Sequence, residues 1–584
     1  MSVDNLLSPN SHPTAGMEDA NTDNPHKRMK RTASSPDLAT ELSSTASPSG
    51  GRQHESPIRS VAGNTLTLDS DPYQVDPKLT EYYLNEYFDN VNIITYCMFP
   101  RVPFMKWVKN CGSKSVWDKM LIYGMLAHGS VFASNSQKKA HGVVFSDIAH
   151  QAVSQCAGVF NLQVVQTRMV LSLYNFALGN SATAWDFAGA AIRAACGMRL
   201  NFEDGVNDVK DEQAMDYGFS RAVLVECRRR TFWSAYIMDH FKGFCTNHLP
   251  MFHDTDCLLR LPCDERQYEE ELIPVTPFFG NGTIISQQSD QSGVGMMGHL
   301  VQLASICGGV LARVFRSRYQ SPGDCGEPFE AFYKRTMEQL RAWENRLGPR
   351  HRSTPENMAR AEQDGYLGAY GALHTLYHCT MMKLNRYVRY TQMTSEQVTR
   401  NIRTAWGHAG LTLELMQDLA KLRRAKKTPP LGFIGSSPFT GFAILSAIDI
   451  LTSTGTLTDL FDTQSRTMSL TAGSIQFLEE LSAHWCSAKR QTRLVAERYG
   501  DLMVTAKSIL FARKVAFFAS SPMETTIGLE DDLIYATPRR QVLDILGMGA
   551  SIVDNDDLLE IRRQCPPGVA NLEGNSSWTN DRDE

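Results

Sequence analysis

The sequence predicts an all-α protein. From about residue 71 to residue 525, apolar residues recur at steps of three and four, which places them on one face of successive helices. No long series of alternating strand patterns breaks this periodicity. The 584-residue chain is also longer than the roughly 250–300 residues at which a single core stops growing. We therefore expect either two helical lobes or one extended helical array.

Residues 1–70 form the first predicted segment, a disordered N-terminal arm. They are rich in Ser, Thr, Pro, Asn and Gly and hold few apolar side chains, so burial cannot offset the entropy of ordering them. A compact basic run interrupts the arm. Such runs act as nuclear import signals or phosphate contacts, and a solvated stretch of charge is the ordinary alternative. The candidate import residues are Lys27, Arg28, Lys30 and Arg31.

Residues 71–270 form the second segment, which we expect to be a helical domain. One apolar stripe extends from Leu162 to Phe176 and another from Trp185 to Ala195, both at helical spacing. Gly179-Asn180-Ser181 separates the two stripes and predicts a helix boundary.

Three segments complete the chain. Residues 271–295 gather Gly, Pro, Gln and Ser without periodicity and predict a linker, whereas residues 296–525 return to helical spacing as a C-terminal helical block. Residues 526–584 form an acidic tail that interleaves carboxylates with Leu and Ile. This composition is typical of activation segments that bind a coactivator groove, and an ordinary helix end is the alternative. The candidate activation residues are Asp554, Asp556, Asp557, Leu558 and Leu559.

Charge and hydropathy exclude several classes of protein. With 58 Lys and Arg against 63 Asp and Glu, the chain has no overall attraction to nucleic acid or anionic membranes, so any DNA affinity must be local. The apolar run from Pro438 to Leu451 is shorter than the roughly 20 residues of a membrane span and contains Asp449. The 13 cysteines are singly spaced, as in reduced intracellular proteins. We expect a soluble intracellular protein without membrane contact.

The most informative stretch extends from Glu226 to Trp233. Glu226 and Arg230 are four residues apart and can pair on one face of a helix, while Phe232 and Trp233 turn toward the neighbouring helix. This pattern of Glu-x-Arg-Arg-Arg-x-Phe-Trp, followed by an apolar stretch and Asp, resembles the middle homology domain of fungal zinc-cluster transcription factors. The residues that carry the signature, with its downstream segment, are Glu226, Arg228, Arg229, Arg230, Phe232, Trp233, Asp239, Pro250 and Pro262.

Flanking features agree with this resemblance in order along the chain. Val164-Val165-Gln166 is similar to a Gln-containing helix of the family. The expected helix around Trp185 is similar to the family helix that follows it. Asp254 and Asp256 are similar to the segment that closes the family's core, and Pro438–Phe442 to a late helix. The resemblance covers residues 75–270 well and 300–520 loosely. It implies a helical regulatory domain in a nuclear regulator of RNA polymerase II transcription and not an enzyme.

Two departures from the family pattern limit what the resemblance implies. Family members carry an N-terminal binuclear zinc cluster held by six thiolates, whereas this sequence has no cysteine before Cys97. No cofactor is therefore expected in this chain, and zinc and direct DNA contact are expected only if such a cluster is missing from it. Otherwise the partner is a DNA-binding protein or a coactivator. The second departure is Asn247-His248-Leu249-Pro250 in place of Gly-Arg-Pro, which removes the backbone freedom of Gly from this turn.

Two other motifs have weaker interpretations. The loop between Cys245 and Cys263 supplies cysteine and histidine side chains at spacings close to those of a zinc site, although lone cysteines there need no metal. Gly293–Gly298 matches the letters of a dinucleotide fingerprint, but a Gln- and Ser-rich stretch precedes it where a strand is required, which favours a simple entry to a helix near Met296. The candidate metal ligands are Cys245, His248, His253, Cys257 and Cys263.

A second function class is a helical sensor or scaffold that binds a small-molecule effector or a partner and never contacts DNA. Aromatic side chains could line a pocket for such an effector, although they more often form core. The sequence shows no nucleophile elbow, phosphate loop or His-Glu-x-x-His helix, so catalysis has no positive support. The aromatic candidates are Phe99, Trp107, Trp185, Trp233 and Phe241.

Overall fold

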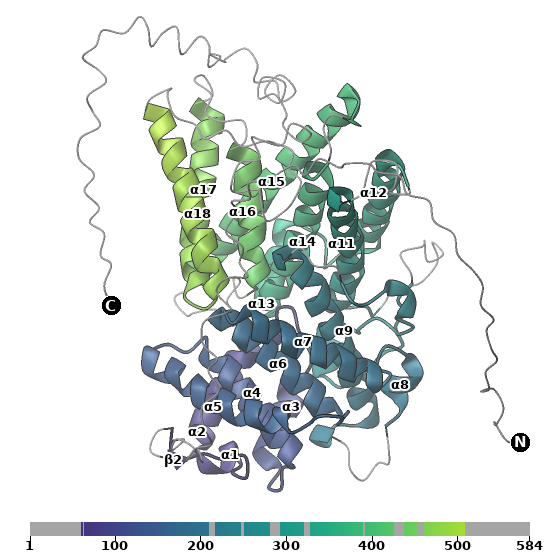
Figure 1. Cartoon of the computed structure of the whole chain (residues 1–584), viewed down its shortest axis with the longest axis vertical. Helices are drawn as coiled ribbons and strands as arrows, with labels where there is room; N and C mark the ends of the chain where they lie inside the picture. Colours follow the sequence, from purple (N-terminus) through teal and green to yellow (C-terminus); the bar gives the residue numbers. More distant parts are fainter. Residues whose placement is uncertain are drawn as a thin grey trace, which may run out of the picture. The chain divides into compact units, whose positions relative to one another are not determined.

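The structure, a computed structural model, describes residues 60–61, 64–209, 216–246, 250–280, 293–319, 327–388, 392–425, 437–452 and 461–507. All of them belong to one compact unit, Ile58–Glu584. Helices make up most of this part of the chain (Figure 1), which confirms the predicted all-α class. Within it, strands are limited to a short antiparallel pair, β1 (Ser60–Val61) and β2 (Asn64–Thr65).

The first helix begins at Pro72 with Asp71 as its cap, but order begins before residue 71, because Leu66 is already buried in the core. Asp71 and Asp76 each accept a hydrogen bond from a backbone N–H in the first turn of the helix that follows, and each is followed by Pro, whose fixed φ suits that position. The helices up to the signature are α1 (Pro72–Val75), α2 (Pro77–Tyr87), the π-helical turn Phe88–Asn92, α3 (Arg101–Asn110), α4 (Val116–Ser130), α5 (Ser136–Ser154), α6 (Leu162–Leu178), α7 (Ser181–Gly197), α8 (Glu203–Asn207) and the 3₁₀ turn Asp216–Gly218.

The boundary predicted at Gly179–Ser181 is confirmed. Gly179 adopts a left-handed conformation with φ of 88° and ends α6, and α7 begins at Ser181. A Cβ at this position would also lie 2.9 Å from the Sγ atom of Cys486, so both the backbone angle and a close neighbour require glycine.

The second half of the described chain is also built from helices. α9 and α11 pack against each other, and α14 to α18 lie side by side as the green-to-yellow group of Figure 1. The predicted helix start near Met296 is confirmed. The elements are α9 (Arg221–Thr246), the 3₁₀ turn Asp254–Asp256, α10 (Glu265–Glu269), α11 (Met296–Tyr319), α12 (Phe329–Arg346), α13 (Pro355–Gln363), α14 (Leu367–Arg386), α15 (Ser395–Ala425), α16 (Pro438–Thr452), α17 (Phe461–Ser482) and α18 (Cys486–Lys507).

α11 is long and apolar enough, by length and composition alone, to cross a membrane. The stretch Met296–Ser317 has a mean hydropathy of 1.3, but 72% of its most apolar part is buried inside the fold. α9, α12 and α14 all contact it. A buried core helix of a soluble protein has the same composition, so this helix is weak evidence for a membrane span, and the expected absence of membrane contact stays a prediction.

The acidic residue in the Pro438–Leu451 run is part of a buried charge cluster. Asp449 has no exposed surface and lies 3.3 Å from Arg498 of α18 and 4.0 Å from Arg386 of α14. A buried carboxylate requires such compensation, because an uncompensated charge in the interior is strongly destabilising. Asp449 therefore ties α16 to two neighbouring helices.

A turn late in the chain packs back onto the first helices. The Lys139 ammonium of α5 donates to the carbonyl of Ala483, and the His484 imidazole contacts the carbonyl of Val131. Trp485 adds ring contacts to His128 and Phe132. Buried apolar side chains from Leu66 to Val495 accordingly form one core cluster. The domain limits predicted at residues 270 and 295 stay predictions.

His128 of α4 is a buried base in this core. Both of its ring nitrogens are buried without a hydrogen-bond partner among the described residues, and the rings of Tyr87, Phe132 and Trp485 surround it. Burial lowers the pKa of His128 to about 3. The folded state therefore binds a proton less readily than the unfolded state, whose histidine titrates near 6.5. Stability is lost as pH falls from about 6.5 toward 3.

We expect His128→Leu to weaken the acid sensitivity of the fold. Between about pH 7 and about pH 5, the wild-type chain should lose about 2 kcal/mol more unfolding free energy than the variant, because the variant has no base at this position to protonate. Thermal unfolding followed by circular dichroism at both pH values measures this difference. His150→Leu is the matched control, since His150 is exposed. Equal pH dependence of His128→Leu and wild type would contradict the prediction.

Candidate functional site

The signature centres on the buried carboxylate of Glu226 in α9. Its Oε1 atom accepts hydrogen bonds from Nε of Arg230 at 2.9 Å and from the backbone N–H of Cys263 at 3.0 Å. Its Oε2 atom accepts a hydrogen bond from Arg229. Glu226 and Arg230 thus pair as their spacing predicts. Burial favours the neutral acid, but the two guanidinium groups and the Cys263 N–H outweigh it and hold the pKa of Glu226 below its usual value.

The three signature arginines connect α9 to two other segments, α8 and the chain around Cys263. Arg228 donates to the carbonyl of Gly205 at 2.9 Å, and Arg229 pairs with Glu203, so both hold α8. Arg230 has no exposed surface and donates to the carbonyl of Cys263 at 2.6 Å. Its other bonds reach the carbonyl of Cys97 at 3.3 Å and the ring of Tyr268 at 4.4 Å. The arginine run is therefore a structural junction and not a solvated basic patch.

Phe232 and Trp233 are fully buried, but their ring partners outside α9 lie on the irregular chain after it and not on a neighbouring helix. Phe232 packs against Phe252 with ring centroids 5.0 Å apart. Trp233 packs against Phe279 at 5.0 Å and donates its indole N–H to the carbonyl of Arg260 at 2.8 Å. The chain from residue 250 to 280 thus contacts both rings, and their predicted packing against a neighbouring helix stays a prediction.

Gln166 is the glutamine of the Gln-containing helix upstream of the signature, and it lies in α6. Its side-chain amide donates to the hydroxyl of Thr231 at 2.9 Å, and its carbonyl oxygen accepts a hydrogen bond from the Tyr217 hydroxyl. Gln166 has no exposed surface, so its polar atoms need these partners. The amide therefore fixes α6 against α9.

The downstream signature residues fold the chain back onto α9. Asp239 accepts hydrogen bonds from the backbone N–H groups of Met251 at 2.6 Å and Phe252 at 3.0 Å. Pro250, just before them, is half-buried, and Pro262 is buried with its carbonyl against the start of α11. Residues 247–249, where the family pattern is broken, lie outside the described residues.

Two further carboxylates join α9, α10 and α11. The spacing of residues in the sequence did not reveal these contacts. Asp254 accepts hydrogen bonds from Tyr236 of α9 and Ser305 of α11, which joins the two helices. Glu265 accepts from the backbone N–H groups of Met296 and Met297, both at 2.9 Å. Glu265 therefore caps α11 with the negative charge that a helix N-terminus favours.

The same contact explains the glycines of the Gly293–Gly298 motif. A Cβ on Gly295 would lie 2.5 Å from the carbonyl oxygen of Cys263 and 2.6 Å from the Glu265 carboxylate. A Cβ on Gly298 would lie 2.5 Å from Val294. Glycine thus permits the close approach of residues 262–265 to α11. The helix N-terminus that a dinucleotide phosphate would need is taken by Glu265.

The metal interpretation of the cysteine and histidine loop finds no support in the part of it that is described. No group of three His, Cys, Asp or Glu side chains among the described residues could hold a metal ion. The thiols of Cys257 and Cys263 are buried, and burial raises their pKa. The His248 residue and the Cys245 side chain lie outside the described residues.

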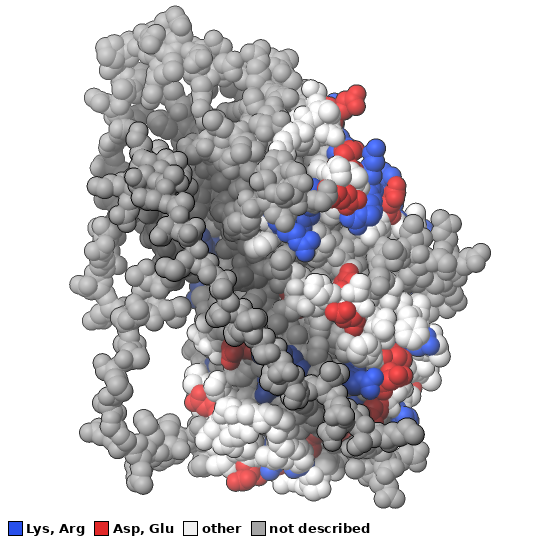
Figure 2. Space-filling model, turned by 45° about the vertical axis from the view of Figure 1, so that its right-hand side comes forward, with Lys and Arg blue, Asp and Glu red and all other residues white. Residues whose placement is uncertain are grey.

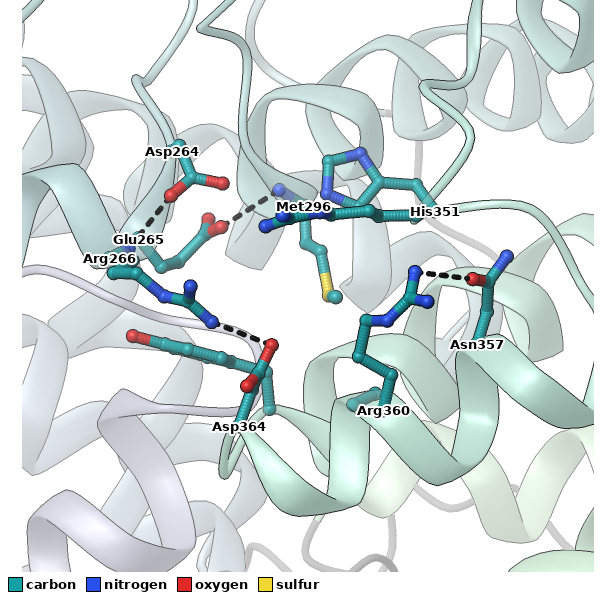
Figure 3. A pocket seen from close by; sticks show the side chains of 11 residues that line it. Asp264, Glu265, Arg266, Met296, His351, Asn357, Arg360 and Asp364 are labelled. Atoms are coloured by element: carbon teal, nitrogen blue, oxygen red, sulfur yellow. Dashed lines mark hydrogen bonds and ion pairs between the residues drawn. The ribbon is translucent and has the colours of Figure 1, made fainter.

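A small hollow with charged walls lies beside this junction (Figure 3). Its lining combines the start of α10, the start of α11 and the chain before, within and after α13. Arg266 and Asp364 pair across it at 2.6 Å. None of the aromatic side chains predicted for a pocket lines this hollow. Phe99, Trp233 and Phe241 are buried in the core. Trp107 is half-buried and packs against the core, and Trp185 lies on the surface. The lining residues are Asp264, Glu265, Arg266, Met296, Arg350, His351, Asn357, Arg360, Ala361, Asp364 and Tyr366.

Surface charge is mixed on the described part of the face shown in Figure 2. Lys and Arg side chains alternate with Asp and Glu there, and uncharged surface separates them. This face therefore offers no broad basic surface of the kind that binds a phosphate backbone. The candidate import residues Lys27, Arg28, Lys30 and Arg31 and the candidate activation residues Asp554, Asp556, Asp557, Leu558 and Leu559 lie outside the described residues.

Comparisons with known proteins agree on one family. Residues 84–343 match the fungal specific transcription factor domain. An uncharacterized transcriptional regulatory protein of Schizosaccharomyces pombe is 23% identical over 56% of this chain and 34% of its own length. A Zn(2)-C6 fungal-type transcription factor of Fusarium oxysporum is 24% identical over 42% of this chain and 27% of its own. A negative regulator of pleiotropic drug resistance from Candida glabrata is 25% identical over 36% of this chain and 22% of its own length.

These matches cover only part of each relative. The chain spans about a third or less of the length of the relatives named above. No solved structure matches the chain. The domain match ends within α12, so the helices from α13 to α18 lie beyond it.

We expect Glu226→Gln to destabilise the fold strongly. The substitution keeps the shape of the side chain but removes the charge that compensates the buried guanidinium of Arg230, and breaking a buried pair in this way costs about 3–5 kcal/mol. Thermal unfolding of the purified chain measures the loss. Glu338→Gln removes an exposed carboxylate from α12 as the matched control and should change stability by less than about 0.5 kcal/mol. Similar unfolding of both variants would show that the buried pair is not required.

Proposed function

Because residues 84–343 form a fungal specific transcription factor domain, we propose that this chain regulates transcription by RNA polymerase II in the nucleus of a fungus. The observation that carries the proposal is this domain match together with relatives whose names describe transcriptional regulation. The buried signature network supports a regulatory role for α9, because it joins α8, α10 and α11 through one cluster of charges. The domain then acts through contacts within the chain or with a protein partner.

DNA recognition in this proposal does not come from the described residues. They contain no group of three side chains that could hold a metal, and the sequence has no cysteine before Cys97, so they do not fit a binuclear zinc cluster. Either a zinc cluster encoded upstream of this sequence or a DNA-binding partner supplies the contact. Sequencing the 5′ end of the transcript decides between these two, because closely spaced cysteine codons in frame identify the first.

The acidic tail is the proposed contact to a coactivator. Carboxylates between leucines keep the apolar side chains in water and available to a hydrophobic groove. A helical sensor that binds a small molecule and does not contact DNA is the second candidate function. The charged hollow between α10, α11 and α13 is the observation that favours it.

We expect the chain to change reporter transcription when it is fused to a heterologous DNA-binding module. In an activator, replacing Leu558 and Leu559 by Ala should lower the reporter signal several-fold, because these side chains supply the apolar contact to the coactivator. Leu572→Ala is the matched control, since it removes a leucine that has few acidic neighbours. A fused chain that leaves the reporter unchanged in every growth condition would contradict the proposed function.

The basic run of the N-terminal arm should direct the chain to the nucleus. Replacing Lys27, Arg28, Lys30 and Arg31 together by Ala should lower the nuclear-to-cytoplasmic ratio of a fluorescent fusion several-fold, because import receptors bind clustered positive charge. The control replaces Arg52 and Arg59, isolated arginines of the same part of the chain, by Ala. If both variants stay nuclear, the basic run is an ordinary stretch of solvated charge.

A further inference from the structure

The charged hollow beside the signature has the size of a small polyatomic anion. Its volume is about 40 Å³. A cavity needs at least roughly 10–15 Å³ to hold one water, so the hollow exceeds this minimum and can admit a small group such as a phosphate or a carboxylate. Figure 3 shows the guanidinium groups of Arg266 and Arg360 on opposite sides of this space, with His351 above them.

The acidic side chains that line the hollow are already engaged. Asp264 accepts hydrogen bonds from the backbone N–H groups of Arg266 and Gln267. Glu265 caps α11, and Asp364 pairs with Arg266 at 2.6 Å. None of these carboxylates forms an ion pair with Arg350 or Arg360.

Two arginines of the lining have no carboxylate partner within the described residues. Arg360 makes one hydrogen bond, 3.4 Å long, to the side-chain oxygen of Asn357. Arg350 makes no hydrogen bond or ion pair with any described residue. The Nδ1 atom of His351 is buried without a hydrogen-bond partner in the described part of the chain. These groups supply hydrogen-bond donors that have no carboxylate partner to a lining that holds three arginines and three acids.

The loop that carries Arg350 and His351 is held in place by α13. The side-chain amide of Asn357 donates to the carbonyls of Pro349 at 2.7 Å and Arg352 at 3.0 Å, and Asn357 is itself 7% exposed. One buried amide thus fixes the loop and, through its oxygen, holds Arg360. The backbone of the loop is therefore preorganised, so little backbone ordering is needed when a ligand binds.

We infer that this hollow binds the oxyanion group of a small molecule, a phosphate or a carboxylate, between Arg350, His351 and Arg360. Guanidinium groups recognise both anions through paired N–H donors. The bound anion would lie beside Glu265, whose carboxylate caps α11 and lies 4.0 Å from Arg230 of the signature. Occupancy of the hollow would therefore act on the junction of α9, α10 and α11. This inference concerns binding alone and does not depend on the proposed role in transcription.

Titration calorimetry of the purified full-length chain tests the inference. Inorganic phosphate and malonate are titrated separately at constant ionic strength, with chloride as the reference anion. We expect saturable binding of at least one of the two, and the one that binds more tightly identifies the class of the natural ligand. Heat no greater than with chloride for both anions would overturn the inference.

Substitutions locate the site. Arg350→Ala and Arg360→Ala should each weaken binding by about tenfold, the effect of losing one charged hydrogen bond. Both side chains are exposed, so circular dichroism should show an unchanged fold. Arg352→Ala is the matched control, because Arg352 lies on the same loop and is exposed but does not line the hollow. Equal loss in all three variants would show nonspecific attraction to positive charge and would overturn the assignment.

Discussion

Glu226 and Arg230 form an ion pair without solvent exposure at the place where α9 meets the chain that leads into α11. Taking two such charges out of water is costly, and the pair is tolerated only when further hydrogen bonds satisfy both groups. The backbone of Cys263 meets this need from both sides, since its N–H bonds to Glu226 and its carbonyl to Arg230. The position of the chain around residue 263 is therefore set by the charges on α9.

Other elements depend on this placement. Once Cys263 is held, Glu265 reaches the first N–H groups of α11, and Gly295 lets the two segments approach. Arg229 extends the cluster to Glu203 in α8. One buried charge on α9 thus organises three segments that are distant in sequence, and the hollow beside α10 exists because α10 is placed by the same network.

Local patterns of the sequence were sufficient for the helices and for contacts within one helix. The periodicity predicts α6, α7 and the break at Gly179, and the spacing of Glu226 and Arg230 predicts their pair. The partners of Glu265 are 31 and 32 positions away, which no helical spacing relates. The lining of the hollow comes from separate segments whose meeting depends on tertiary packing, so the sequence offered no signal for it.

The docking of the Ala483–Trp485 turn on α4 and α5 also constrains how the protein is made. Lys139 and Ala483 are 344 positions apart. At about 5–20 residues per second, a ribosome needs about 17–70 s to synthesise the chain between them. During that time the apolar surface around Phe132 and Val131 has no native cover. The native packing around Val131 and Phe132 can therefore be completed only after residues 483–485 have been synthesised.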